Sequence, residues 1–394
     1  MTVLYVLKRY PRLSETFIVR ELIGVEALGV RVLVDALLPP EDEPRHPEVE
    51  LVGARPRYLP RRPSLRIVLA VAARAPRATA LELGRALALR RAGDPRAIRR
   101  WRQAVLVAER ARREGVAVIH AHFATAAAEV ARAAGRMAGV PVTVTAHAKD
   151  IFHTENAPVL RRRLADVQTL VTVSEFNRAH LAVVAPDTLT RVVRNGVALG
   201  PVNTLHVGTR SAPVLTVSRL VAKKGLDTLV RAIALVDDPL LHLDVIGGGP
   251  LLGELCALAE ELGVADRVTF HGPQPSRVVD AAYAGCSLVA LPCRVDGDGD
   301  RDGLPTVLVE ALARGIPVVS TSVVGIPELV RHEQTGLLVP PDDPAALAAA
   351  IGRLRSDATQ ARALGLTGRR LVEAQYAPAD SAKALLAVWQ EAAA

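Results

Sequence analysis

Residues 214–235, VLTVSRLVAKKGLDTLVRAIAL, join a short β-rich run to a stretch whose apolar residues have helical spacing. The same pairing recurs toward the C-terminus, with strands predicted at 242–247, 267–272, 287–292 and 317–321. It also precedes this stretch, with strands predicted at 3–7, 31–36, 116–120, 142–146 and 169–173. Strands that alternate with helices are typical of parallel sheets built from βαβ units. The sequence therefore predicts an α/β fold with two doubly wound domains in tandem.

The boundary between the two domains is predicted near residue 200. A turn-like segment, Arg194–Val197, is followed there by Gly200 and Pro201. The length of 394 residues also fits two domains of about 150 to 200 residues each. We expect domains at 1–200 and 201–375, with residues 376–394 forming a C-terminal helix that packs back on the first domain.

The composition, 50% hydrophobic and 23% charged, is typical of a soluble globular protein. The longest clean apolar run, Ile67–Ala73, is far shorter than the ~20 residues of a membrane helix. The N-terminus lacks the apolar stretch of a secretory signal, so a cytoplasmic location is predicted. Three cysteines without CxxC spacing indicate neither a disulfide framework nor a thiolate zinc site: Cys256, Cys286 and Cys293.

The net charge of +8 is unevenly distributed. Residues 1–200 carry 32 Lys and Arg against 19 Asp and Glu, whereas residues 201–394 carry 17 against 22. Within the first half, residues 55–113 hold 17 Arg and three acids. This stretch is a candidate surface for peripheral binding at the inner face of a membrane. The alternatives are an Ala-rich helix with its arginines facing outward and the Arg usage of a GC-rich genome. Aromatic residues are only 3%, which argues against nucleic-acid binding.

Two groups of residues in the second half point to a ligand site. Arg219 and Lys224 lie at a strand-to-helix turn, where both can face an anion such as a diphosphate. The run Gly247–Gly249 follows the next strand and allows the backbone to approach a ligand closely. Leu252 stands where the dinucleotide fingerprint has its third glycine, so a bound dinucleotide cofactor is not predicted.

Asp302 and Glu310 form a pair of carboxylates around a predicted helix start near Leu304. We expect Asp302 at the mouth of this helix and Glu310 about two turns in, facing a polyhydroxylated ligand together with free backbone amides. Neighbouring aspartates resemble a calcium loop, but the spacing does not fit an EF-hand because Val309 occupies the twelfth position.

Histidines follow predicted strands in the first half. His147 and Asp150 come after one strand, and His120 and His122 after another. Histidines at such positions can bind metal, act as acid or base, or be purely structural. No HExxH or HxxEH spacing is present, so no metal site is predicted.

Taken together, these motifs resemble GT-B retaining glycosyltransferases of the family 4 type. The pieces of the second half that carry the resemblance are VSRLVAKKGLDTLVRA, LDVIGGGPLLGELCALAEELGVADRVTFHG, DGLPTVLVEALARGIPVVST and GIPELVRHEQTGLLVPPDDP. In the first half, LKRYPRLSETFIVREL, HAHFAT, HAKDIF and VSEFNR are similar to the subgroup that builds exopolysaccharides such as colanic acid. The resemblance implies two Rossmann-like domains facing across a cleft, the first binding the acceptor and the second the nucleotide-sugar donor.

The resemblance also assigns residues to roles. It implies that Arg219 and Lys224 hold the donor diphosphate, that Glu310 binds the ribose, and that Asp302 and His147 contact the donor sugar. The family usually has Glu at the position of Asp302. The remaining residues expected to border the donor are Gly248, Gly249, Gly303, Leu304, Pro305 and Thr306.

The implied activity is transfer of a hexose or amino sugar from a UDP- or GDP-sugar to a hydroxyl group, with retention and without a metal or other cofactor. The acceptor would be a saccharide, a lipid-linked molecule or a small molecule, in polysaccharide or glycolipid biosynthesis. Two alternatives stay open. One is a tailoring glycosyltransferase of a secondary metabolite, such as an aminoglycoside-type antibiotic. The other is a catalytically silent sugar-nucleotide-binding subunit.

Overall fold

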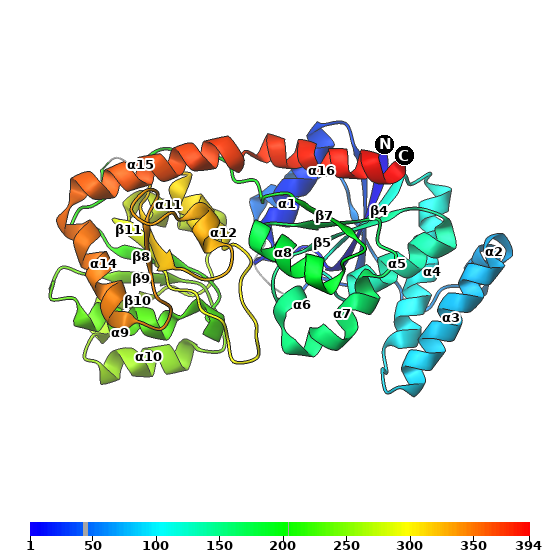
Figure 1. The fold of residues 1–394 in the computed structure, drawn as a ribbon, viewed down its shortest axis with the longest axis horizontal. Coiled ribbons are helices and arrows are strands. Elements are labelled where there is room, and N and C mark those ends of the chain that lie inside the picture. Colours follow the sequence, from blue (N-terminus) through cyan, green and yellow to red (C-terminus); the bar gives the residue numbers. More distant parts are fainter. Residues whose placement is uncertain (42–45, 204) are drawn as a thin grey trace. The chain divides into compact units, whose positions relative to one another are not determined.

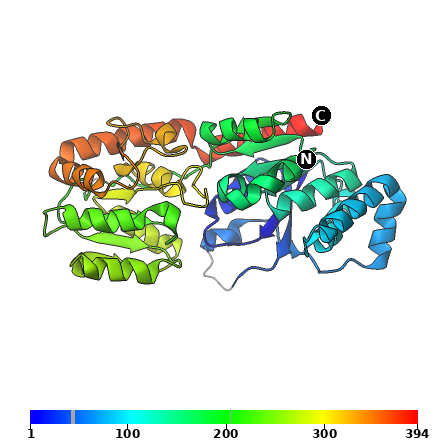
Figure 2. The ribbon, with the colours of Figure 1, turned by 60° about the horizontal axis from the view of Figure 1, so that its bottom comes forward.

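The computed structural model describes residues 1–41, 46–203 and 205–394, which form two compact units (Figures 1 and 2). The first unit contains Met1–Val173, Asn177–Val193 and Ser381–Ala394. The second contains Ser174–Phe176 and Arg194–Asp380. The division thus falls between Val193 and Arg194, a little before the predicted boundary at residue 200. The last residues of the chain belong to the first unit.

In its described residues, the first unit has a seven-stranded parallel sheet of order β3-β2-β1-β4-β5-β6-β7. Its strands are β1 (Thr2–Arg9), β2 (Arg31–Leu38), β3 (Pro56–Tyr58), β4 (Val118–His122), β5 (Val142–Ala146), β6 (Thr169–Thr172) and β7 (Leu189–Val192). Its helices are α1 (Thr16–Ala27), α2 (Leu65–Arg74), α3 (Pro76–Arg91), α4 (Ala97–Arg113), α5 (Ala126–Ala138), α6 (Lys149–Phe152), α7 (Ala157–Leu164) and α8 (Glu175–Val184), with 3-10 turns at Pro47–Leu51 and Thr154–Asn156.

In the described part of the second unit, a six-stranded parallel sheet has the order β10-β9-β8-β11-β12-β13. Its strands are β8 (Val214–Val217), β9 (Leu243–Ile246), β10 (Val268–Phe270), β11 (Leu288–Leu291), β12 (Val318–Thr321) and β13 (Leu337–Val339). Its helices are α9 (Leu226–Leu235), α10 (Leu252–Glu261), α11 (Ser276–Gly285), α12 (Thr306–Leu312), α13 (Ile326–Leu329), α14 (Pro344–Ser356) and α15 (Ala358–Gln375), with 3-10 turns at Ala222–Lys224 and Ala265–Arg267. The predicted α/β class with two doubly wound domains is confirmed.

The central strands are apolar along most of their length because helices cover both faces of each sheet (Figures 1 and 2). All residues of β4, β5, β11 and β12 are buried. The edge strands β3, β7 and β13 were not predicted, since their three or four residues include polar or half-exposed positions. One predicted strand boundary was wrong: β4 begins at Val118 rather than Val116. His120 and His122 therefore lie within the strand and not after it.

The strand order reverses direction beside β1 and β4 in the first unit, and beside β8 and β11 in the second. At such a switch point the connections leave to opposite sides, and the carboxyl ends of the two strands border an open crevice where ligands bind. The predicted site residues Arg219 and Asp302 follow β8 and β11, and His122 ends β4. Both switch points are therefore places to look for chemistry.

Residues 64–91 form two helices, α2 and α3, that pack on α4 at the border of the first unit (Figure 1). A single residue, Ala75, separates the two helices. In the described part of the chain, no helix is both long and apolar enough to cross a bilayer.

The last helix, α16 (Pro378–Ala393), contributes to the core of the first unit. Trp389 is fully buried against Tyr5 of β1, with ring centroids 5.8 Å apart. Ala382, Leu385 and Val388 belong to the same cluster of buried side chains. A helix at the end of the chain thus completes the packing of its first strand.

Candidate functional site

The turn after β8 is built so that Lys224 stands directly before a helix. Gly225 caps α9 with a φ of +64°, and a Cβ there would come within 2.0 Å of the Pro292 carbonyl oxygen. No other residue fits this position without moving the backbone. The close contact fixes the turn after β8 against the loop that follows β11.

Lys224 is held by a carboxylate from that neighbouring loop. Its Nζ lies 2.5 Å from Asp302 Oδ2, while Lys223 Nζ lies 3.2 Å from Asp302 Oδ1 and 3.0 Å from Asp300 Oδ1. The Cys293 thiol donates to Asp302 Oδ2 at 3.6 Å. We call Lys223, Lys224, Asp300 and Asp302 the lysine–aspartate cluster.

Burial and pairing act in opposite directions in this cluster. Burial alone would raise the pKa of Asp302, but the two lysines outweigh it and hold that pKa well below its ordinary value. Burial alone would lower the pKa of Lys224, but the charge of Asp302 raises it. Burial raises the pKa of the Cys293 thiol to about 12. At neutral pH Asp302 and Lys224 are therefore ionised, beside a neutral Cys293 thiol.

Arg219 follows β8 and is exposed. Within the described residues its guanidinium makes no hydrogen bond or ion pair, and its positive charge slightly opposes that of Lys224. The prediction that Arg219 and Lys224 share one turn agrees with this placement, but only Arg219 is left available to an added anion. Lys224 would have to share its ammonium group between Asp302 and a ligand.

The glycines at 247–249 are required by the packing of one backbone segment on another. A Cβ at Gly247 would lie 1.8 Å from the Ser218 carbonyl oxygen, and a Cβ at Gly249 would lie 2.4 Å from that of Leu220. A Cβ at Gly248 would instead lie 2.9 Å from Cγ of the Pro273 ring. The structure thus gives these glycines a role in holding the 218–220 turn, a role that the sequence did not reveal.

The helix carrying Glu310 begins later than predicted. Its first residue is Thr306, with Pro305 at the cap, so Glu310 lies about one turn in rather than two. A proline disfavours the helical conformation in the residue before it, here Leu304, and this delays the start. Before the helix, the buried Gly303 accepts a hydrogen bond from the Gly325 amide, and Leu304 packs partly against the core.

Glu310 is held by a tyrosine that the sequence analysis missed. The Tyr283 hydroxyl donates to Glu310 Oε2 at 3.1 Å, and the Arg314 guanidinium lies over the Tyr283 ring, 4.7 Å from its centroid. Burial, reinforced by the charge of Glu310, raises the pKa of Tyr283 well above its ordinary value. No contact between Asp302 and Glu310 is seen in the described residues, so the two carboxylates have separate partners.

A second cluster lies at the switch point of the first unit. His122 Nε2 donates to Glu21 Oε1 at 2.8 Å, and His122 Nδ1 lies 3.1 Å from His147 Nε2. The Tyr5 hydroxyl donates to the same Glu21 oxygen at 2.8 Å. Glu21 comes from α1 and was not predicted, because an acid in an amphipathic helix looks like any solvated surface residue. Tyr5, Glu21, His122 and His147 are called the histidine cluster below.

The other residues singled out here have structural partners. His120 lies between two hydroxyl groups, with Nδ1 2.8 Å from Thr143 Oγ1 and Nε2 3.1 Å from Thr145 Oγ1. Burial lowers the pKa of His120 to about 3. Asp150 accepts hydrogen bonds from the amides of Ala124 and Ala148, both at 2.8 Å, and so ties together the loops after β4 and β5.

Among the described residues, Glu21, His120 and His122 form the group with the right ligand types for a metal ion. One ligand atom from each lies within 4.8 Å of the others. The relevant nitrogens of both histidines, however, already meet hydroxyl, imidazole or carboxylate partners. The arrangement is therefore complete as a hydrogen-bonded network.

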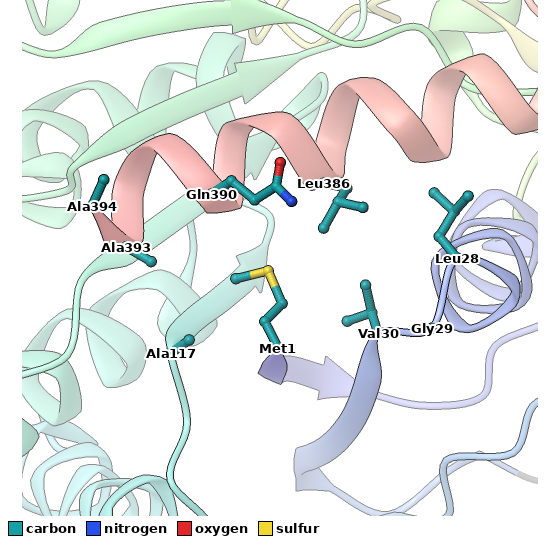
Figure 3. A pocket seen from close by; sticks show the side chains of 9 residues that line it. All are labelled: Met1, Leu28, Gly29, Val30, Ala117, Leu386, Gln390, Ala393 and Ala394. Carbon is teal, nitrogen blue, oxygen red and sulfur yellow. The ribbon is translucent and has the colours of Figure 1, made fainter.

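The pocket in Figure 3 lies at the opposite end of the same sheet. Its cavity of about 430 Å³ is bordered by Met1, Val30 and Ala117, which precede β1, β2 and β4, and by residues of α16. Ligands of doubly wound sheets bind at the carboxyl ends of the strands, whereas this pocket is at the amino ends. Gln390 is the polar side chain drawn in it, so it offers little for catalysis.

Both halves of the chain match known glycosyltransferase domains. Residues 68–200 match Glycosyltransferase Family 4, and residues 207–371 match Glycosyl transferases group 1. The matched regions adjoin near the division between the two units.

Two curated relatives are similar in sequence. A GDP-mannose-dependent alpha-(1-6)-phosphatidylinositol monomannoside mannosyltransferase of Mycobacterium tuberculosis is 41% identical over 166 residues, which cover 41% of this chain and 43% of that protein. The match therefore spans less than half the length of that relative. The amylovoran biosynthesis glycosyltransferase AmsK of Erwinia amylovora is 30% identical over 274 residues, 66% of each chain.

A solved structure shares the fold over nearly the whole chain. Anabaena Alr3699/HepE, crystallised with UDP and glucose, aligns with a TM-score of 0.76 at 18% identity, over 99% of this chain and 100% of that one. At this identity the likeness establishes the fold, which is GT-B. With both domains present and this fold, the chain belongs to the glycosyltransferases of the group 1 and family 4 type.

Proposed function

We propose that the protein transfers a hexose or amino sugar from a UDP- or GDP-sugar to a hydroxyl group, with retention at the reacting carbon. The observation that carries this proposal is the turn after β8, where Arg219, which has no ion-pair partner among the described residues, follows the same strand as the lysine–aspartate cluster. Three cations face two carboxylates there, so a surplus positive charge remains for a diphosphate. The turn lies at the switch point of the second sheet, where such folds bind ligands.

The diphosphate would be the part of the donor that the cations bind, and it would also be the leaving group. Arg219 and Lys224 would neutralise the charge that develops on it, which is the usual way to favour departure of a phosphate. We propose that these side chains replace a divalent metal. No protein nucleophile is assigned, because the departing oxygen can itself accept the proton of the incoming hydroxyl.

The carboxylates would bind the rest of the donor. Asp302 accepts from two lysines and one thiol, which leaves part of its lone-pair capacity for a sugar hydroxyl. Glu310, oriented by Tyr283, would accept from the ribose. The related proteins named above include one described as GDP-mannose-dependent and one crystallised with UDP, which supports a UDP- or GDP-linked donor.

The test begins with binding and ends with transfer. A thermal-shift panel of UDP, GDP, ADP and TDP identifies the nucleotide, since a ligand that binds only the folded state raises its apparent stability. The matching nucleotide sugars, with and without EDTA, are then offered with saccharide, lipid-linked and small hydroxylated acceptors. Product with retained configuration is expected in both conditions. Nucleotide binding without hydrolysis or transfer would contradict the proposal and favour a silent binding subunit.

We further propose that helices α2 and α3 place the enzyme on the cytoplasmic face of an anionic membrane, where a lipid-linked acceptor would be found. Leu65 and Leu69, one turn apart on α2, are 71% and 59% exposed, and exposed arginines lie around them. An exposed apolar stripe with a basic flank suits a membrane interface. Not all of the basic stretch takes part: Arg57 and Arg110 pair with the buried Asp35 inside the fold.

Vesicle flotation tests the membrane surface directly. We expect the protein to float with anionic vesicles at low salt, and a double variant, Leu65→Ser with Leu69→Ser, to lose most of that binding. A matched control, Leu366→Ser, changes another exposed leucine, in the second unit, and should float normally. Failure of the wild-type protein to float would remove the membrane proposal and leave the donor site untouched.

A further inference from the structure

Lys223 is the lysine of the lysine–aspartate cluster to which the proposed function gives no role. Its side chain is 3% exposed, and its ammonium group lies 3.0 Å from Asp300 Oδ1 and 3.2 Å from Asp302 Oδ1. Lys224, which follows it in the chain, is partly exposed. A buried ammonium group that already meets two carboxylates is poorly placed to bind a ligand. Lys223 therefore acts through its neighbours in the fold.

Asp300 is the principal partner of Lys223. Among residues 294–302, all of which the structure describes, Asp300 is the buried one. A turn within this loop fixes its backbone: the Asp296 amide donates to the Asp300 carbonyl at 2.9 Å, and the Asp300 amide donates to Asp298 Oδ1 at 2.8 Å. Burial of a carboxylate is costly unless a cation accompanies it. Asp300 and Lys223 are therefore buried as a pair.

The two oxygens of Asp302 are divided between the two lysines. Oδ1 lies 3.2 Å from Lys223 Nζ, and Oδ2 lies 2.5 Å from Lys224 Nζ. In the described residues, Asp302 Oδ2 is the hydrogen-bond partner of Lys224, whose ammonium group has further N–H donors. These other donors of Lys224 are left for an added anion.

The charge balance of the cluster depends on Lys223. With Lys223 present, two lysines face two carboxylates. Without it, Lys224 alone would face Asp300 and Asp302, and the surplus negative charge would repel an incoming diphosphate. A buried ion pair is weak evidence for added stability, since apolar side chains of similar volume often stabilise a fold equally well. A buried pair beside a candidate anion site therefore favours a role in charge balance.

We propose that Lys223 is a positioning residue: it balances the charges of Asp300 and Asp302, so that the ammonium group of Lys224 stays available to the donor diphosphate. This inference rests on the proposed function and deepens it, because it assigns a residue that does not touch the donor. Lys224 and Arg219 bind the diphosphate, and Lys223 determines how strongly Lys224 can do so.

Two variants that break the same ion pair distinguish charge balance from a purely structural role. Lys223→Met removes the positive charge, whereas Asp300→Asn removes the negative charge and keeps an oxygen that can accept from Lys223. We expect Lys223→Met to weaken the binding of UDP or GDP about tenfold, measured by calorimetry, and Asp300→Asn to strengthen it by up to about threefold. If the pair only held the loop, both variants would weaken binding, and that result would overturn the proposal.

A double variant keeps the test valid if Lys223→Met does not fold. Lys223→Met combined with Asp300→Asn removes both charges of the pair, so the affinity should return to within about threefold of the wild-type value. A double variant that binds as weakly as Lys223→Met would contradict the charge balance.

Arg355→Met is the matched control, because it also removes a buried cation of the second unit. Arg355 pairs with Asp238 at 3.2 Å and donates to the carbonyl of Ala212, which precedes β8. It therefore lies at the amino end of the strand, whereas the cluster lies at the carboxyl end. Arg355→Met should lower the urea midpoint of the second unit without changing the nucleotide affinity. Reduced affinity in this control would show that loss of any buried cation disturbs the site.

Ammonium spectra identify which lysine meets the anion. The chain has five lysines, so protein labelled with ¹⁵N at lysine gives few signals, and Lys223→Met and Lys224→Ala assign two of them. Addition of UDP, GDP or inorganic diphosphate to the wild-type protein should shift the Lys224 signal strongly and the Lys223 signal weakly. A Lys223 signal that shifts as much as that of Lys224 would make Lys223 a ligand of the anion and overturn its positioning role.

The inference and the proposed function can fail separately. If UDP or GDP binds but the two single variants behave alike, the proposed function stands and the role of Lys223 is wrong. If neither nucleotide binds, the proposed function fails, and inorganic diphosphate then tests Lys223 with the same variants. Absence of binding by all three anions would overturn both.

Discussion

The lysine–aspartate cluster of the second unit and the histidine cluster of the first occupy equivalent places in their sheets but are built from different chemical groups. Each lies at the switch point of a parallel sheet and is built from side chains far apart in sequence. The first of them is held by full charges, Lys224 against Asp302. The other is held by hydrogen bonds that join two imidazoles, His122 and His147, to one carboxylate, Glu21. The full charges of the lysine–aspartate cluster suit an anionic leaving group.

The largest expected effect comes from removing a charge from the lysine–aspartate cluster. In Lys224→Ala, transfer should fall by about 10² to 10³-fold, because a preorganised positive charge facing the leaving diphosphate is lost. Circular dichroism should stay unchanged, since Lys223 still pairs with Asp300 and Asp302. Arg362→Ala, an exposed charge on α15, serves as the control and should keep full activity. Normal turnover in Lys224→Ala would mean that the cluster does not face the leaving group.

The stabilities of the two units should respond differently to acidification. His120 has a folded-state pKa of about 3, below its ordinary value of 6.5, so the unfolded chain binds the proton first as the pH falls. The stability that its neutral form contributes is fully present above about pH 6.5 and is lost as the pH falls toward 3. Between pH 7 and 5 this loss is about 2 kcal/mol. Asp302 behaves differently: its lowered pKa means that its contribution declines only below about pH 4.

Urea unfolding monitored by hydrogen exchange can follow each unit. The first unit should lose stability between pH 7 and 5, and His120→Gln should flatten this dependence, because glutamine can still meet Thr143 and Thr145 but does not titrate. The second unit provides an internal control, since the Asp302 contribution is constant over this range. An equal pH slope in His120→Gln and the wild-type protein would show that His120 is not kept neutral by the fold.

A smaller effect is expected at Glu310. Tyr283→Phe removes one hydrogen bond to this carboxylate, which is worth about 1 kcal/mol. We expect nucleotide affinity, measured by calorimetry, to fall about fivefold while kcat changes little. Tyr376→Phe is a matched control, because Tyr376 is also fully buried in the second unit and is not seen to bind Glu310 in the described residues. Equal affinities for the two variants would argue that Glu310 does not bind the nucleotide.

The smallest effect is expected from Asp302→Glu, which restores the residue usual in the family. Both lysines have long, flexible side chains that can follow the carboxylate outward, so donor affinity and turnover should change less than about threefold. The isosteric Asp302→Asn, by contrast, would leave buried lysines with fewer counter-charges and should destabilise the second unit. Loss of activity in Asp302→Glu would show that this protein requires the shorter side chain.

The sequence predicted the fold class and the strands that follow the apolar, β-branched pattern of a parallel sheet. It also placed Arg219 and Lys224 at one turn, because these residues are close in the chain. The pairing of Lys224 with Asp302 and of Glu21 with His122 could not be predicted, since each depends on which strands become neighbours. The local pattern also predicted two boundaries wrongly. Pro305 delays the start of α12, and the apolar run Val116–Ile119 made β4 appear to begin two residues too early.

Helix α16 determines when the first unit can complete its folding, because it lies at the end of the chain. Trp389 fills the core beneath β1, so the first unit lacks the largest of its fully buried side chains until the C-terminal residues have left the ribosome. The second unit needs none of Ser381–Ala394 and can fold earlier, although it is synthesised later than most of the first. The first unit therefore cannot complete its core before the C-terminal residues have been synthesised. A chain that ends before Trp389 would contain every residue of the second unit, whereas its histidine cluster would rest on an unfinished core.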